Sequence, residues 1–101
     1  MSGGYSYTTI TSAPEEPTRI GVSFYLDDAA WIRAVGEERE RPQLSIRHGH
    51  VDADFAPTLG PITDTDVRIA RQLAEQAALY AGLVERLKAN QDAREQAGTA
   101  A

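Results

Sequence analysis

Residues 63–87, TDTDVRIARQLAEQAALYAGLVERL, decide the fold of this chain. Apolar side chains within them recur three or four residues apart, which is the spacing that lines up one face of an α-helix. We call this set the apolar stripe, and its members are Ile69, Leu73, Ala77, Tyr80, Val84 and Leu87. The opposite side of the same helix is mainly charged and carries Arg68, Arg71, Glu75, Gly82 and Arg86. The stretch therefore predicts a long helix that must lay one face on an apolar surface.

The start of this helix is marked by residues that satisfy its first free N–H groups. Thr63 can cap the helix through its hydroxyl, while Asp66 reaches back in a weaker version of the usual glutamate box. Ile62 and Val67 occupy the two positions of a hydrophobic staple around that cap. Beyond the apolar stripe the sequence is polar and alanine-rich, so we expect the helix to fray and residues 91–101 to form a disordered tail.

Alternation of apolar and polar residues predicts strands in the first half of the chain. The clearest covers Arg19–Leu26, and two shorter ones cover Gln43–Arg47 and Val51–Phe55. The two shorter strands flank His48-Gly49-His50, so we expect a β-hairpin in which the glycine supplies a positive φ. One continuous strand through the glycine is the alternative.

The segment between these strands allows two interpretations. Asp27 offers a cap for a short helix that would end near Gly36, and a strand across Trp31–Val35 is the competing interpretation. Residues 37–42 contain charges of both signs and no apolar side chain, which favours a solvated loop.

These elements together predict the α+β class. Residues 1–18 would form a flexible arm or an edge strand, residues 19–90 a single domain, and residues 91–101 the tail. In the domain, a small antiparallel sheet of three to four strands is covered on one face by the long C-terminal helix. The core would then contain four stripe residues, each worth about 1.5–3 kcal/mol when fully buried. They are Leu73, Tyr80, Val84 and Leu87.

Composition excludes several classes of function. A chain of 101 residues, 42% hydrophobic and 25% charged, lies in the ordinary range for one small domain. The sequence has no cysteine, which excludes disulfides, thiolate nucleophiles and sulfur-ligated metal sites. The net charge of -5 disfavours a surface for duplex nucleic acid, because phosphate contacts require clustered lysine and arginine. Neither a signal peptide nor a membrane span is expected, so we predict a cytoplasmic protein without a cofactor.

A ligand-like pattern occurs after the second predicted strand, where imidazoles and carboxylates alternate with small residues. His48, His50 and Asp52 are the candidate metal ligands, and Asp54 is a further one. In a strand these side chains would share one face, although a turn at the glycine would separate them. The pattern resembles the His-x-His-x-Asp opening of metallo-β-lactamase-like hydrolases, but Ala53 stands where a further histidine is expected, and the chain is much shorter than that fold.

Catalytic patterns are weak in this sequence. Ser45, His48 and Asp52 contain the residue types of a nucleophile, a base and an orienting acid. Their adjacency in one strand does not give the converging geometry that such a triad needs. The isolated glycines lack the strand-to-helix context of a phosphate-binding loop. The sequence therefore predicts no catalytic residues.

Two features favour a protein partner. Trp31 is the single tryptophan and precedes a charged loop, where burial in a core and an interface role are comparable interpretations. On the helix, small residues beside the apolar stripe would permit close approach of a second helix, while Leu79 stands almost alone on the polar side. The small residues proposed for this interface are Ala74, Ala78 and Ala81. The alternative is that alanine is present only as the best helix former.

One resemblance covers residues 42–88. A β-rich front, an acidic strand end near Val51–Phe55, and Thr63 followed by Leu73-Ala74 and Tyr80 on a long helix resemble small uncharacterised proteins of actinobacteria and their phages. The resemblance implies no activity and no site residue.

We therefore expect a non-enzymatic binding or regulatory protein that acts through a protein partner, as a homodimer. One alternative is a metal- or small-ligand-binding domain that uses the turn at His48 and His50. Another is an acidic mimic that inhibits a nucleic-acid-binding protein, which rests on the net charge of -5.

Overall fold

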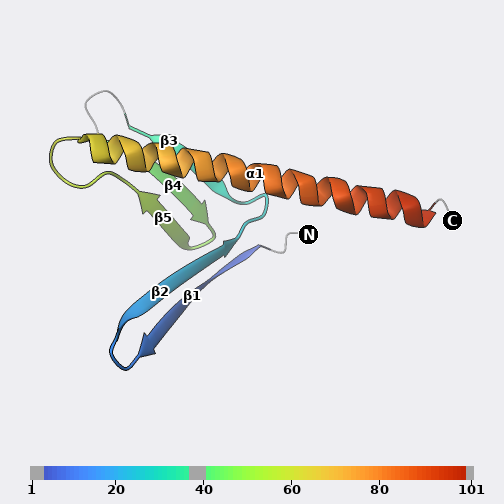
Figure 1. The fold of residues 1–101 in the computed structure, drawn as a ribbon, viewed down its shortest axis with the longest axis horizontal. Coiled ribbons are helices and arrows are strands. Elements are labelled where there is room, and N and C mark those ends of the chain that lie inside the picture. The colour runs from blue at the N-terminus through green and yellow to red at the C-terminus, as the bar shows by residue number, and fades with distance from the viewer. Residues whose placement is uncertain (1–3, 37–40, 100–101) are drawn as a thin grey trace. The chain divides into compact units, whose positions relative to one another are not determined.

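The computed structural model describes residues 4–36 and 41–99. Its elements are two small antiparallel sheets and one long helix, which confirms the predicted α+β class (Figure 1). They are β1 (Tyr5–Ala13), β2 (Glu16–Tyr25), β3 (Trp31–Val35), β4 (Gln43–His48), β5 (Val51–Phe55) and α1 (Asp64–Thr99). The chain divides into two units, Met1–Pro57 with the strands and Thr58–Ala101 with the helix.

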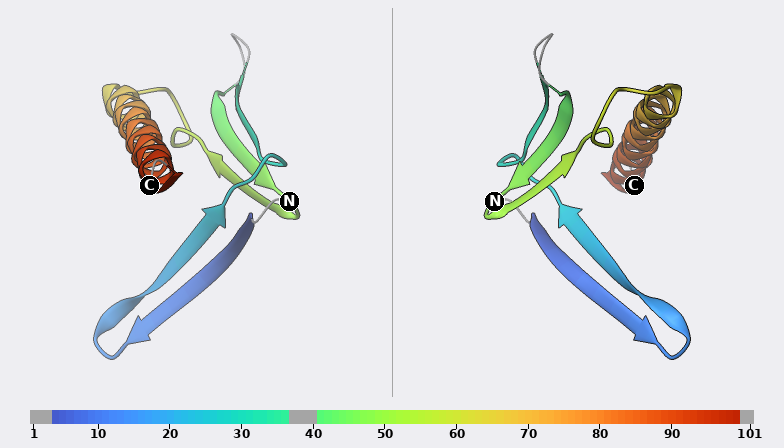
Figure 2. Two further views of the ribbon diagram at one scale, coloured as in Figure 1. Left: turned by 90° about the vertical axis from the view of Figure 1, so that its right-hand side faces the viewer. Right: turned by 90° about the vertical axis from the view of Figure 1, so that its left-hand side faces the viewer.

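β1 and β2 form a two-stranded antiparallel ribbon (Figure 2). Their pairing runs from Tyr5 opposite Tyr25 to Ala13 opposite Glu16. Glu15, in the two-residue connection, has a φ of 70°, and a proline precedes it, which is the pattern of a type II turn. The segment predicted as an arm or edge strand is thus paired over most of its length, with Pro14 in the turn and Pro17 in β2.

The two faces of this ribbon differ in chemistry. Cross-strand partners share a face, so the register places aromatic and hydroxyl side chains on one side and apolar ones on the other. The apolar side carries Ile10, Ile20, Val22 and Phe24. Of these, Ile10 and Ile20 are 67% and 70% exposed. The ribbon therefore presents an apolar face that the described residues leave largely uncovered.

β3, β4 and β5 form the second sheet, with β4 in the centre. The strand over Trp31–Val35 is the competing interpretation given above, and the short helix is wrong. The physical reason is pairing: every residue of β3 has a partner on β4, and this ladder outweighs the weak helix cap at Asp27. Asp27 instead closes a turn, in which its carbonyl accepts from the N–H of Ala30 at 3.0 Å.

Two details of the predicted sheet also need correction. The strand predicted as Arg19–Leu26 spans Glu16–Tyr25 and lies in the ribbon, not in the sheet with the other two strands. The turn between β4 and β5 has two residues, because His48 still pairs with Val51. Gly49 has a φ of 62°, as predicted for the glycine of this hairpin.

The helix begins as the sequence predicts. The N–H of Asp66 donates to Oγ1 of Thr63 at 3.2 Å, and Oδ2 of Asp66 accepts from the N–H of Thr63 at 2.9 Å. This reciprocal pair is a capping box with aspartate in place of glutamate. At the other end α1 continues to Thr99, so the predicted disordered tail is wrong over residues 91–99. Frequent alanines and an ion pair between Lys88 and Asp92 support these last turns.

No hydrophobic side chain is buried among the described residues. Within its own unit α1 has no second helix or strand in residues 58–99 to cover its apolar stripe. The four predicted core residues, Leu73, Tyr80, Val84 and Leu87, are 39%, 67%, 48% and 59% exposed, so contacts within their own unit do not bury them. That the helix covers one face of the sheet concerns the relative placement of the two units and stays a prediction.

Parts of the predicted loop and of the predicted tail fall outside what the structure describes. Residues 37–40 of the predicted charged loop and residues 100–101 of the predicted tail lie outside the described ranges.

Candidate functional site

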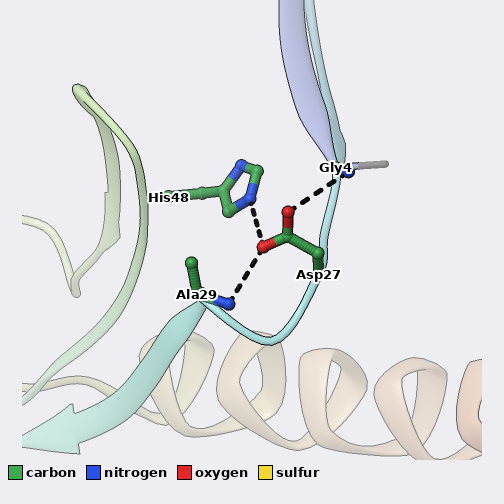
Figure 3. Close-up of polar contacts among 4 residues, drawn as sticks. All are labelled: Gly4, Asp27, Ala29 and His48. Atoms are coloured by element: carbon green, nitrogen blue, oxygen red, sulfur yellow. Dashed lines mark hydrogen bonds and ion pairs between the residues drawn. The ribbon is translucent and has the colours of Figure 1, made fainter. Parts of the chain in front are cut away.

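The most closely connected polar site lies between the end of β4 and the turn that follows β2 (Figure 3). Nε2 of His48 lies 3.0 Å from Oδ1 of Asp27, and the two side chains are only 9% and 12% exposed. An ionised carboxylate can only accept hydrogen bonds, so the proton of this bond belongs to Nε2 of the imidazole. The pair thus joins residues 21 positions apart in the sequence.

Two backbone N–H groups also donate to the Asp27 carboxylate. Oδ1 also accepts from the N–H of Ala29 at 2.9 Å, which orders the turn before β3. Oδ2 accepts from the N–H of Gly4 at 3.2 Å (Figure 3). A Cβ on Gly4 would stand 2.5 Å from the carbonyl oxygen of Tyr25, so only glycine fits here without movement. We call these four residues, Gly4, Asp27, Ala29 and His48, the histidine clasp.

The histidine clasp does not bring the predicted metal ligands together. His50 is exposed in the turn, whereas His48 is buried against Asp27. Asp52 pairs with Arg47, so it lies on the face opposite to His48, and its Oδ1 is 3.8 Å from Nε of Arg47. In residues 4–36 and 41–99, no group of three or more metal-ligating side chains gathers at one point. The structure therefore gives the metal interpretation no converging site.

Ser45 occupies the other face of β4 and is 1% exposed. Its hydroxyl donates to Oδ1 of Asp54 at 2.6 Å and accepts from Nε2 of Gln43 at 3.0 Å. Ser45 and His48 are three positions apart in one strand and point to opposite faces. These contacts give the buried hydroxyl of Ser45 both a donor and an acceptor partner, and His48 is not one of them.

Trp31 lies on the same face of the sheet as Ser45, directly opposite Arg47 on β4. The guanidinium carbons of Arg47 and Arg33 lie 4.6 and 5.9 Å from the centre of its ring. Both distances fall within the range of cation–π attraction. The candidate interface tryptophan is thus half-buried beside its own arginines.

A cluster of tyrosines on the ribbon was not identified as a site by sequence reasoning. The rings of Tyr5 and Tyr25 stack at 4.5 Å, and those of Tyr7 and Tyr25 at 5.7 Å. A hydrogen bond to Ser23 lowers the pKa of Tyr7, and the hydrogen bond with Tyr7 raises the pKa of Tyr25. The three tyrosines come together through the pairing of β1 with β2. The sequence analysis did not predict this pairing and therefore did not predict the cluster.

The candidate interface residues on α1 are all exposed: Ala74, Ala78, Leu79 and Ala81. Leu79, at 57% exposure, is less isolated than the sequence suggested, because Leu83 follows it at the next position on the same side and is 51% exposed. Leu83 also borders the apolar stripe and widens it. The exposed apolar surface of α1 is therefore larger than the predicted interface.

Comparisons of this chain with protein-family models, curated proteins and solved structures find no match. No helix in the described part of the chain combines the length and the apolar composition needed to cross a bilayer.

Proposed function

We propose that this protein is a non-enzymatic binding module that associates with a second copy of itself through the apolar stripe of α1. The observation that carries the proposal is the exposure of this stripe on a helix of 36 residues. Contiguous apolar surface of this kind marks interaction sites on soluble proteins. Ala74 and Ala81 at its border are small enough to let a second helix approach closely.

The charges on the helix favour a second copy in antiparallel orientation. A line of residues at seven-position intervals contains three members of the stripe between two charged ends. It reads Asp66, Leu73, Tyr80, Leu87 and Arg94. In a parallel pair, each charged end would face the same charge of the other copy. In an antiparallel pair centred on Tyr80, Asp66 meets Arg94 of the second copy at both ends, and Leu73 meets Leu87.

Burial of the stripe must offset the free-energy cost of association. Full burial of a large apolar side chain contributes about 1.5–3 kcal/mol, and each helix brings several of them. Association costs roughly 4–15 kcal/mol of lost freedom, so a contact along the whole stripe is sufficient while one or two side chains are not. The stripe from Ile69 to Leu87 is about 27 Å long at 1.5 Å per residue.

The association is tested by light scattering coupled to size-exclusion chromatography. Val84→Glu places a charge within the stripe and is expected to weaken the dimer by a factor on the order of 100. Ala89→Glu adds the same charge on the side of α1 opposite Tyr80 and is expected to leave the dimer intact. A wild-type chain that stays monomeric at its highest soluble concentration would overturn the proposal, as would equal effects of the two variants.

The orientation is tested by reversing one charge. Arg94→Glu replaces the attraction to Asp66 of the second copy by repulsion in the antiparallel pair, whereas in a parallel pair it exchanges one like-charge contact for another. We expect weaker association that recovers at high salt, because screening removes the repulsion. Arg86→Glu makes the same charge change on the polar side and serves as the control.

The acidic mimic stays a prediction, and the described carboxylates do not favour it. Asp27, Asp52 and Asp54 each engage a side chain of their own unit.

A further inference from the structure

The strands at the borders of the two sheets differ in how their outer edges are protected. β1, β2, β3 and β5 each have a neighbouring strand on one side only, within residues 4–36 and 41–99. Charged residues and proline protect such edges, because they disfavour pairing with another strand. β2 contains Glu16, Pro17 and Arg19, β3 contains Arg33, and β5 contains Asp52 and Asp54. β1 differs from these three strands because it has neither a charge nor a proline.

β1 is suited to pairing in composition, length and accessibility. Its nine residues, YSYTTITSA, are almost all hydroxyl-bearing, aromatic or β-branched. Every second residue of a strand directs its N–H and C=O away from the partner strand, so β1 carries a row of such groups on its outer edge. Among the described residues, no backbone hydrogen bond joins that edge to another segment. Most of the strand is also exposed.

We propose that the outer edge of β1 pairs antiparallel with β1 of a second copy, so that two ribbons form one four-stranded sheet. A two-fold axis places each residue of β1 opposite another residue of the same strand. Such self-pairing is penalised when a strand is charged, and β1 has no charge. Its threonines and serines can instead form hydrogen bonds across the pair. A two-stranded ribbon is only marginally stable by itself, and a sheet of four strands is more stable.

This contact is independent of the apolar stripe on α1, because it uses the other unit of the chain and backbone groups in place of apolar side chains. The edge contact of β1 can therefore be absent while the helix contact of α1 is present, and the reverse. The measurements below distinguish these outcomes.

The chain has no cysteine, so single cysteines report on the contact without a background. Thr8→Cys, Thr9→Cys and Thr11→Cys scan the middle of β1. Paired residues of antiparallel strands have Cα atoms about 4.5–5.5 Å apart, which is within the range for a disulfide. The position nearest the two-fold axis is expected to form a disulfide-linked dimer under mild oxidation, at least tenfold faster than the control.

Thr18→Cys in β2 is the control, because it is an exposed threonine of the same ribbon. In the four-stranded sheet, β2 and its copy are separated by three strand spacings, or about 14 Å, which a disulfide cannot bridge. Equal dimer formation by Thr18→Cys and the β1 variants would overturn the proposal.

Amide hydrogen exchange on the unmodified chain gives a second measurement. The outward amides of β1 are expected to exchange more slowly as protein concentration rises, whereas the amides of β3 and β5 are not. Repeating both measurements with Val84→Glu separates the two surfaces. Protection of β1 that persists in this variant supports the edge contact by itself. Exchange of β1 that is independent of concentration in the wild type would overturn the edge contact, and leaves the helix contact to be judged by its own variants.

Discussion

The sheet of β3, β4 and β5 differs from helix α1 in what stabilises it. At the centre of the sheet, Ser45 and His48 are buried and have hydrogen-bond partners within the same unit. Along α1, the side-chain contacts lie at exposed positions, among them Thr63 with Asp66 in the first turn and Lys88 with Asp92. The sheet is therefore stabilised by contacts of its own unit, whereas no helix or strand within residues 58–99 covers the apolar stripe of α1.

This difference indicates where binding and stability reside. Buried polar groups with partners specify one local arrangement, because any other arrangement leaves them without hydrogen bonds. Exposed apolar side chains specify no arrangement by themselves and gain free energy only when another surface covers them. We infer that substitutions in the histidine clasp change stability, and that substitutions on the stripe of α1 change association.

The largest effect on stability is expected for His48→Ala. The substitution removes the hydrogen bond from Nε2 of His48 to Oδ1 of Asp27, in a site that is almost closed to water. Loss of a hydrogen bond to a buried charged group destabilises by about 2–3 kcal/mol. Urea unfolding followed by fluorescence measures this loss at the sheet, because Trp31 is the single tryptophan and lies on β3.

His48→Gln is the matched control for this variant, since the amide of glutamine can still donate to the carboxylate. It is expected to recover part of the lost stability. Far-UV circular dichroism, which is dominated by α1, should change little in either variant. Unfolding of the helix and the sheet in one transition would contradict the separate stabilisation of the two units.

A smaller loss is expected for Gly4→Ala. The added Cβ would stand 2.5 Å from the carbonyl oxygen of Tyr25 and 2.7 Å from Oδ2 of Asp27, so backbone must move. Such overpacking costs about 1–3 kcal/mol. Gly21→Ala is the control, because its Cβ would meet the nearest atoms of Thr9 at 3.9 Å, an ordinary contact. Thermal unfolding that ranks the two variants equally would show that the Gly4 contact does not anchor the start of β1.

The sequence predicts the local elements better than the contacts between them. The helix start at Thr63, the strand Val51–Phe55 and the positive φ of Gly49 all follow from local rules on capping, alternation and turns. The assignment of β2 to its own ribbon does not follow from such rules, because an alternating strand pairs equally well with several neighbours. The pairing of β1 with β2 decides that question, and it depends on the tight turn at Pro14 and Glu15, which the sequence analysis did not identify.

The candidate site illustrates the same limit. The sequence draws attention to His48, His50 and Asp52 because they are close along the chain, yet alternation of faces separates them. The residue that contacts His48 is Asp27, which is 21 positions away in the sequence. The local sequence around Asp27 indicated a helix cap instead. No spacing rule connects these two residues, because the turn of β4 and β5 and the end of β2 bring them together.

The smallest effect is expected at the start of α1 and depends on pH. Hydrogen bonds from Thr63 hold the pKa of Asp66 below its ordinary value of about 3.9. A carboxyl group whose pKa is lower in the folded state stabilises that state above its unfolded pKa, and this contribution is lost as pH falls through the folded value. The first turn of α1 should therefore lose stability below about pH 4. Far-UV circular dichroism during thermal unfolding at several pH values measures this loss.

Asp66→Asn removes the titrating group and should flatten this part of the pH dependence, so the difference between the wild type and the variant isolates Asp66 from the other carboxylates. Asp64→Asn removes the same charge from the same turn and leaves the box with Thr63 in place, so its pH dependence should remain close to that of the wild type. Equal flattening in both variants would assign the effect to the general attraction between acidic residues and the helix N-terminus. In that case the capping box would not be the source of the lowered pKa, and α1 would lack a specific contact comparable to the histidine clasp of the sheet.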